Sequence, residues 1–123
     1  MLVPLTRKIS TLELARALGL PLIVVARAGL GTINHSLLTL RAARQAGLVV
    51  AAVVPNHHEP DTDSTETDKK IEADNREIIQ SISGVTVFQP LPHVPGAGES
   101  VEPTRRLAGL LAERGMDKLI GSI

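Results

Sequence analysis

The sequence has 123 residues, and thirteen basic side chains balance thirteen acidic ones, so its formal net charge is zero at neutral pH. The neutral balance gives no general attraction to nucleic acid or to an anionic membrane, and no apolar run approaches the roughly 20 residues needed to span a bilayer. Cysteine does not occur, which excludes disulfides and thiolate metal sites and fits a cytoplasmic protein.

The first predicted element is a short helix over residues 11–18. Ser10 followed by Glu13 is a capping-box pattern, and Gly19 is a typical C-terminal stop. The apolar residues expected on the inner face of this helix are Leu12, Leu14, Ala15 and Leu18. The apolar stretch 2–5 has no preceding element to pack against, and we expect it to be the end of a longer segment.

A strand, a glycine turn and a second helix follow over residues 20–46. Residues 22–26 form a continuous apolar run rich in β-branched side chains, which is typical of a strand covered on both faces. Gly29 and Gly31 permit a tight turn, Thr32 is placed to cap the helix, and Asn34 falls in its first turn. The free N–H groups and the dipole of such a helix start favour a carboxylate or phosphate.

The rest of the chain repeats the alternation of strand and helix. Further strands are predicted at 48–54 and 85–88, and further helices at 67–82 and from Pro103 onward. The polar stretch 57–68 reads as a mobile surface loop, and the proline-rich stretch 89–98 can be neither helix nor central strand. The expected inner faces of the second, third and last helices are Leu37, Leu38, Ala42 and Ala46, then Ile71, Ile78, Ile79 and Ile82, then Leu107, Leu110 and Leu111.

This order of elements predicts an α/β fold with a parallel sheet and right-handed crossovers. Ligands of such sheets lie beyond the carboxyl ends of the strands. We therefore expect three loops to meet at one edge and to form the site: residues 27–34, 55–63 and 89–98.

Several short motifs of the sequence bear on its chemistry. Residues 29–34 partly match the dinucleotide fingerprint, but Asn34 replaces the third glycine and no acidic residue follows the second strand. An anion site, or a turn that uses glycine only for its geometry, fits better. The stretch from His57 to Asp63 could suggest a metal, yet a solvated loop is the simpler interpretation. His35 is expected to be structural, and no Gly-x-Ser-x-Gly elbow supports a hydrolase.

Residues 25–39, Val-Ala-Arg-Ala-Gly-Leu-Gly-Thr-Ile-Asn-His-Ser-Leu-Leu-Thr, closely resemble the dethiobiotin synthetases. The likeness continues in register through residues 2–5, 45–48, 53–56 and 89–94. It covers most of this sequence but only the C-terminal half of that family's enzyme. The resemblance therefore implies that residues 1–123 form a single partial domain: a partial parallel sheet flanked by helices, half of a P-loop NTPase-like α/β fold.

The resemblance also implies an activity, that of an ATP- and magnesium-dependent cyclo-ligase of biotin biosynthesis. The family converts 7,8-diaminononanoate and CO2 to dethiobiotin through a carbamate that ATP phosphorylates, and its members are homodimers. The P-loop, its lysine and the metal ligands belong to the preceding half, and no Gly-x-x-x-x-Gly-Lys-Ser/Thr motif occurs here. We therefore expect the isolated chain to be inactive unless a separate P-loop chain complements it.

The family pattern assigns two sets of binding residues in this sequence. Those expected to hold the substrate carboxylate of the other subunit, through main-chain N–H groups and one amide, are Gly31, Thr32, Ile33 and Asn34. Asn56 is expected to hydrogen bond the adenine amino group, and the base is expected to pack against Pro92, His93 and Val94. No catalytic residue and no metal ligand is assigned, because these residues position substrates.

Two other functions remain open from the sequence. One is a non-catalytic regulatory module that uses the same pocket for a small anion or a nucleotide. The other is a relative of the cobyrinate amidase group, which shares the fold. A Gly-x-x-x-x-Gly-Lys-Thr motif encoded directly upstream would favour the ligase.

Overall fold

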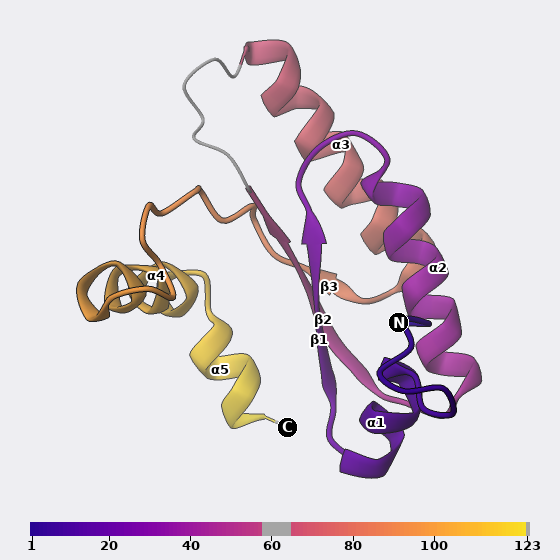
Figure 1. The fold of residues 1–123 in the computed structure, drawn as a ribbon. Helices are drawn as coiled ribbons and strands as arrows, with labels where there is room; N and C mark the ends of the chain where they lie inside the picture. The colour runs from indigo at the N-terminus through magenta and orange to yellow at the C-terminus, as the bar shows by residue number, and fades with distance from the viewer. Residues whose placement is uncertain (58–64, 123) are drawn as a thin grey trace.

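The computed structural model describes residues 1–57 and 65–122 (Figure 1). Its centre is a three-stranded parallel sheet in the order β1-β2-β3. The strands are β1 (Leu22–Arg27), β2 (Val50–Asn56) and β3 (Thr86–Val87). The helices are α1 (Thr11–Leu18), α2 (Thr32–Gln45), α3 (Glu66–Ser83), α4 (Val101–Glu113) and α5 (Met116–Gly121).

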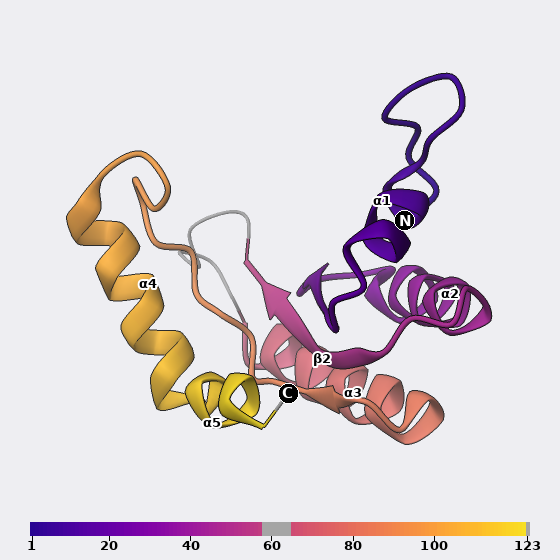
Figure 2. The same ribbon diagram turned by 90° about the horizontal axis from the view of Figure 1, so that it is seen from below.

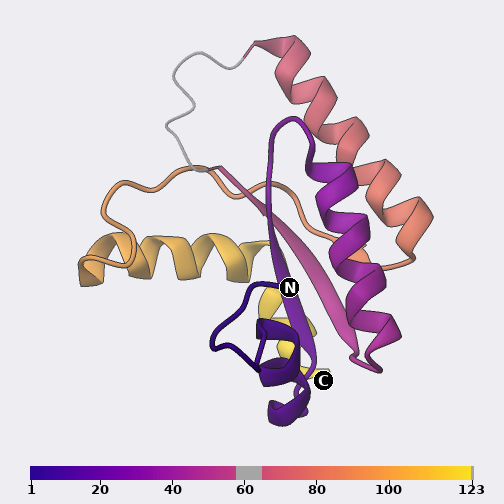
Figure 3. The same cartoon turned by 45° about the vertical axis from the view of Figure 1, so that its right-hand side comes forward.

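Helices cover both faces of this sheet, in two separate layers. Helices α2 and α3 lie side by side on one face, and α4 with α5 lies on the other (Figures 1, 2 and 3). Consecutive residues of β2 point into the two layers: Val53 packs with Leu40 and Ile79, whereas Val54 packs with Leu91 and Met116. The predicted α/β fold with a parallel sheet is confirmed, and it is consistent with a P-loop NTPase-like architecture.

The start of α1 is the predicted capping box. The Ser10 hydroxyl accepts from the Leu12 N–H at 3.2 Å, and the Glu13 carboxylate accepts from the Ser10 N–H at 2.6 Å. Gly19 ends the helix with φ +65°, a conformation that glycine adopts without strain. A second capping box, Thr65 with Asp68, starts α3 within the stretch that the sequence assigned to a loop. The remainder of that predicted loop, residues 58–64, lies outside the described residues.

The expectation that β1 is covered on both faces is wrong. Exposure alternates along β1, and Ile23 and Val25 are 38% and 67% exposed. The reason is position: β1 is an edge strand, and the layer of α4 and α5 packs against β2 and the residues that follow β3. The central strand β2 is the one enclosed on both sides, with residues 52–55 all buried.

Pro55 explains why β3 is shorter than predicted, whereas β2 keeps the predicted seven residues and is shifted by two along the chain. β2 continues through Pro55 and Asn56 instead of ending at Val54, whereas β3 keeps only two of the four residues expected for it. The His57 N–H points toward the β3 side, where it donates to Leu91, so an N–H at position 55 would point there too. Proline has no N–H, and pairing on that side stops after Phe88 and resumes at Leu91.

The predicted helices exist, but their buried faces are rotated or smaller than predicted. α2 buries Thr32, Ser36, Leu40 and Ala43. Among the predicted residues, Leu38 is exposed in α2, only Ile79 is buried in α3, and only Ala15 is buried in α1. The last helix begins at Val101, two residues before Pro103, and α5 was not predicted. No helix of residues 1–57 and 65–122 has the length and apolar character of a membrane span.

Candidate functional site

Main-chain hydrogen bonds join the three predicted loops at the carboxyl edge of the sheet. The N–H of Ala28, just after β1, donates to the carbonyl of Asn56 at 3.2 Å. The N–H of Leu91 donates to the carbonyl of Pro55, and the N–H of His57 donates to the carbonyl of Leu91, both at 2.9 Å. The turn after β1, the end of β2 and the proline-rich segment therefore form one continuous edge, as the topology predicted.

Asn56 and the proline turn are neighbours in this edge. Asn56 is bridged to Leu91, which is 4% exposed and packs with Val54 and Met116. Pro92, His93 and Val94 follow directly, and all three are half-buried. The Asn56 carboxamide, also half-buried, makes no hydrogen bond to any residue in 1–57 or 65–122.

This pairing suits one kind of ligand. A carboxamide offers two donors and an acceptor, so it can read the edge of a heterocycle that carries both kinds of group. The adjoining proline turn supplies partly apolar surface on which a flat ring could lie. The residues present therefore fit a flat heterocycle such as a purine base.

The second candidate site is the start of α2. Gly31 is the residue before the helix, with φ +84° and no side-chain cap, and the first turn contains no acidic residue. The N–H groups of Ile33 and Asn34 have no partner within the helix, because the first four N–H groups of an α-helix precede any acceptor. Asn34 is exposed, and its carboxamide makes no hydrogen bond to the described residues. The helix start is thus open to an anion.

Thr32 does not play its predicted capping role. It is the first residue of α2, it is 5% exposed, and its hydroxyl lies 3.4 Å from that of Ser36 inside the fold. Since the helix begins one residue earlier than expected, the capping position falls on Gly31. Only the main chain of Thr32 is available at the helix start, where its N–H already points to the Gly29 carbonyl at 3.3 Å.

A groove of about 760 Å³ runs from this helix start along the contact of α2 with α3. Gly31, Ile33 and Asn34 are among the residues that line it. Thr32 instead faces a separate hollow of about 200 Å³ beside β1, which Arg27 and His35 also line. Three of the four residues expected to hold a carboxylate therefore share one concave surface, and its apolar walls suit an aliphatic chain that ends in an anion.

The metal interpretation gains no support in the described residues. His57 contacts Glu72 of α3, with 3.3 Å between Nε2 and Oε2, so this histidine has a structural partner. The residues with which it was grouped, His58 to Asp63, lie outside the described residues. Within 1–57 and 65–122 no three histidine or acidic side chains gather to hold a metal ion.

Two features of the edge escaped the sequence analysis. Leu91 connects the end of β2 to the proline turn, and its position between two prolines in an apolar stretch was the available signal. Arg114, beyond α4, donates through Nη2 to the carbonyl of Pro90 at 3.2 Å. Nothing in the sequence pattern marks that contact, because 24 residues separate its partners.

Comparisons with known proteins agree with this geometry. A family model described as "AAA domain" matches residues 1–100. Proteins named ATP-dependent dethiobiotin synthetase BioD are similar to the chain: 39% identity over 114 residues in Anaeromyxobacter dehalogenans (strain 2CP-1) and 43% over 110 residues in Anaeromyxobacter sp. (strain Fw109-5). The protein of that name in Bacillus cereus (strain B4264) is 39% identical over 94 residues.

These alignments cover 93%, 89% and 76% of this chain, but 47%, 47% and 36% of the relatives. The chain thus spans about half the length, or less, of the curated relatives it matches. The family model covers most of the sequence, and the resemblance to dethiobiotin synthetases that the glycine turn indicated is confirmed. The chain belongs to the AAA-domain family.

Proposed function

We propose that this chain is the part of an ATP-dependent dethiobiotin synthetase that holds the adenine base and the carboxylate tail of the substrate. The observation that carries the proposal is the joined edge of the sheet. Asn34 in the first turn of α2 and Asn56 at the end of β2 carry carboxamides that make no hydrogen bond to the described residues. The hydrogen bond from Ala28 to Asn56 joins the turn before α2 to the end of β2. The names of the relatives supply an ATP-dependent dethiobiotin synthetase activity. The family resemblance adds 7,8-diaminononanoate and CO2 as the substrates and the cytoplasm as the location, and we extend both to this chain as part of the proposal.

In this proposal Asn56 reads the adenine amino group and Pro92, His93 and Val94 pack the ring. ATP supplies the phosphoryl group that activates the carbamate, and Mg²⁺ accompanies it. We assign the phosphates and the metal to the P-loop half of the family's domain. The contribution of the described residues is to fix the base, because a nucleotide held at one end presents its phosphates at a defined place.

The carboxylate tail is assigned to the start of α2. In this proposal Gly31, Thr32, Ile33 and Asn34 surround the carboxylate. The main-chain N–H groups of Ile33 and Asn34 donate to it, and the Asn34 carboxamide adds a neutral donor. Charge-assisted hydrogen bonds from such donors are stronger than neutral ones, and the helix dipole adds to them. We propose that this tail comes from the active site of a second subunit in a homodimer.

We further propose that residues 1–123 are half of a larger α/β domain. The support is β1, an edge strand whose outward residues Ile23 and Val25 remain exposed. A long apolar edge strand that is left open invites pairing with another strand. Additional strands beside β1 would cover it, and would bring the phosphate-binding loop to the same edge as Asn56.

The test is a pair of asparagine variants of this chain with opposite expected effects. Binding is followed by the NMR shifts of backbone amides while the protein is titrated with ATP, GTP, 7,8-diaminononanoate or its methyl ester. Asn56→Ala should weaken ATP binding by about 1–2 kcal/mol, the cost of one hydrogen bond whose partner stays buried, and should narrow the preference for ATP over GTP. It should leave binding of the diamine unchanged.

Asn34→Ala should do the reverse. It should weaken diamine binding by roughly ten- to a hundredfold, the value of a charge-assisted hydrogen bond, and leave ATP binding unchanged. In the wild type the methyl ester should bind more weakly than the free acid. In Asn34→Ala the ester should bind only slightly more weakly than the acid, because the interaction with the carboxylate is already lost. If the two losses simply add, Asn34 does not touch the carboxylate; if Asn56→Ala keeps the nucleotide preference, the base lies elsewhere.

A further inference from the structure

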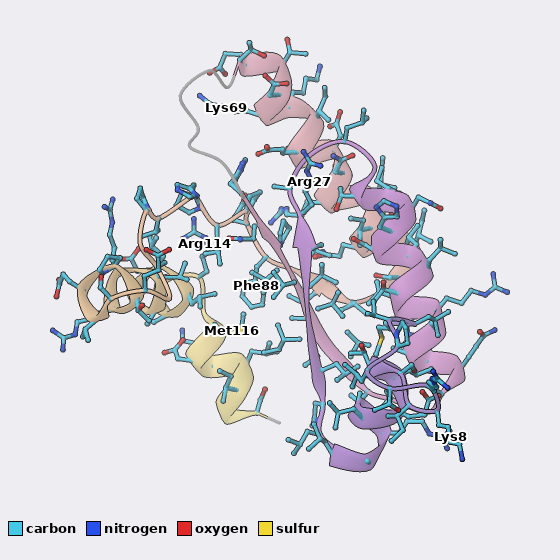
Figure 4. All side chains as sticks on the ribbon, in the orientation of Figure 1. Lys8, Arg27, Lys69, Phe88, Arg114 and Met116 are labelled. Carbon is cyan, nitrogen blue, oxygen red and sulfur yellow. The ribbon has the colours of Figure 1, made fainter. Side chains whose placement is uncertain are left out.

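The segment before the proline turn is held from two sides. Main-chain hydrogen bonds hold it on the sheet side, and one arginine side chain holds it on the other. On the sheet side, Leu91 is bonded through its main chain to Pro55 and His57. On the other side, Arg114 reaches Pro90 from the junction of α4 and α5. Figure 4 shows Arg114 between α4 and the proline segment, with Met116 below it. Residues 90 and 91 are therefore fixed by hydrogen bonds immediately before the turn at 92–94.

Arg114 is fixed by two carbonyl contacts that come from different elements. Nη1 donates to the Leu110 carbonyl of its own helix at 3.1 Å, and Nη2 donates to the Pro90 carbonyl at 3.2 Å. The planar guanidinium can serve both acceptors at once, whereas the single ammonium of a lysine cannot reproduce that fork. The contact thus sets the distance between α4 and the proline segment, and does not merely place a charge.

Burial of part of the Arg114 guanidinium carries an energetic cost. Nε is buried and has no hydrogen-bond partner among the described residues. Burying a charged group with an unmet donor is unfavourable, so the position is maintained by its two carbonyl contacts and by the packing around it. Two residues further along the chain, Met116 packs with Val54 and Leu91 and so holds α5 against the end of β2.

We propose that Arg114 is a positioning residue for base recognition: through Pro90 it fixes the proline turn, Pro92 to Val94, at the distance from Asn56 that accepts an adenine ring. The inference rests on the proposed function, since it concerns the same base site. Arg114 acts through Pro90 and Leu91 and does not itself contact the nucleotide. Losing it should let the turn move relative to Asn56, and the discrimination between purines should fall.

The test compares Arg114→Gln with Arg114→Lys and with Arg105→Gln. Arg105 also lies on α4, but its side chain is 75% exposed and its ion-pair partner is Glu102 of the same helix, so this control removes the same charge without touching the turn. The chain is titrated with ATP and with GTP, and the ratio of the two dissociation constants is measured from the amide shifts of Asn56, Leu91 and His93. Arg114→Gln should lower that ratio by about three- to tenfold, which corresponds to the loss of one hydrogen bond.

In Arg114→Lys the ratio of the dissociation constants should lie between those of Arg114→Gln and the wild type, because lysine keeps the charge and can make one of the two hydrogen bonds. In Arg105→Gln the ratio should equal that of the wild type. A merely structural role would lower the thermal midpoint without altering the ratio. If Arg114→Gln does not fold, the same ratio is measured in Arg114→Lys, and a value equal to that of the wild type refutes the inference. If Asn56→Ala lowers the ratio of the dissociation constants and Arg114→Gln leaves it unchanged, only the role of Arg114 is refuted. If ATP causes no shift at these amides in the wild type, both the base site and the role of Arg114 are refuted.

Discussion

Gly31 permits a test that separates backbone strain from ligand binding. It has φ +84° at the start of α2, and a Cβ built there meets nothing within 4 Å. Gly115 has the same φ, the same position before a helix, and the same free space. Gly31→Ala and Gly115→Ala therefore impose the same conformational strain, but only Gly31 borders the proposed carboxylate site.

The expected loss of stability follows from the backbone alone, because no clash has to be relieved. A non-glycine residue in the left-handed region costs roughly 1–2 kcal/mol. The alanine also restricts the unfolded chain, which returns about 0.4–1 kcal/mol. Each variant should thus lose about 1 kcal/mol, or roughly 3–6 °C in Tm for a chain of this size.

Stability is best measured by circular dichroism during urea unfolding, because the chain has no tryptophan or tyrosine to report by fluorescence. Carboxylate binding is measured by NMR titration with 7,8-diaminononanoate. Both variants should lose similar stability, and only Gly31→Ala should also lose affinity for the diamine, because only there does the strained backbone border the proposed carboxylate site. Equal affinity in both variants would show that the helix start does not bind the carboxylate; a loss of stability in Gly115→Ala alone would refute the strain calculation.

Two further predictions concern the α3 side of the fold. Ile79→Ala should destabilise the chain by about 2–5 kcal/mol, because this side chain is 1% exposed, whereas Ile82→Ala on the same helix, 65% exposed, should stay within about 0.5 kcal/mol of the wild type in urea unfolding. The Thr65 hydroxyl, and then its N–H, hold the pKa of the Asp68 carboxyl below the ordinary value of 3.8. The cap therefore stabilises the start of α3 above that value and is lost as pH falls through the lowered pKa, so the amide shift of Thr65 should titrate below pH 3.8 and should not titrate in Asp68→Asn.

Local signals predicted the elements that depend on local chemistry. The capping box of Ser10 and Glu13 and the stop at Gly19 set the bounds of α1, and the structure has both. The alternation of apolar runs and amphipathic stretches was sufficient for the parallel sheet and for the edge where the loops meet. Asn56 and the proline turn were expected at one site from the family pattern, and the bridge through Leu91 places them side by side.

The errors share a different cause, since periodicity marks apolar residues but not what covers them. Leu38 and Ile82 belong to apolar stripes and yet are exposed, while the hydroxyls of Thr32 and Ser36 are buried. The face of α2 is set by its simultaneous contact with the sheet and with α3, which no window of its own sequence contains. Arg114 was missed for the same reason, because its partner Pro90 is remote in the sequence.

The edge position of β1 leads to a last prediction, for hydrogen exchange. The N–H of Leu22 donates to Val49 and that of Ala28 donates to Asn56, both toward β2. Because N–H groups alternate in direction along a strand, those of Val24 and Ala26 also point to β2. The N–H groups of Ile23 and Val25 point to the open edge, where no described strand pairs with them.

Amide exchange of this chain, followed by NMR, should therefore alternate along β1, slow at Val24 and Ala26 and fast at Ile23 and Val25. Leu91 and His57 should be as slow as Val24, since their N–H groups are bonded at the joined edge. This combination would show that the proposed base site is formed without any cover on β1. Uniformly slow exchange along β1 would mean that another strand occupies the edge, and slow exchange that becomes fast on dilution would identify that strand as a second copy of the chain. Fast exchange at Leu91 and His57 would contradict the preformed edge itself, because the bonds that join Asn56 to the proline turn would then be open for much of the time.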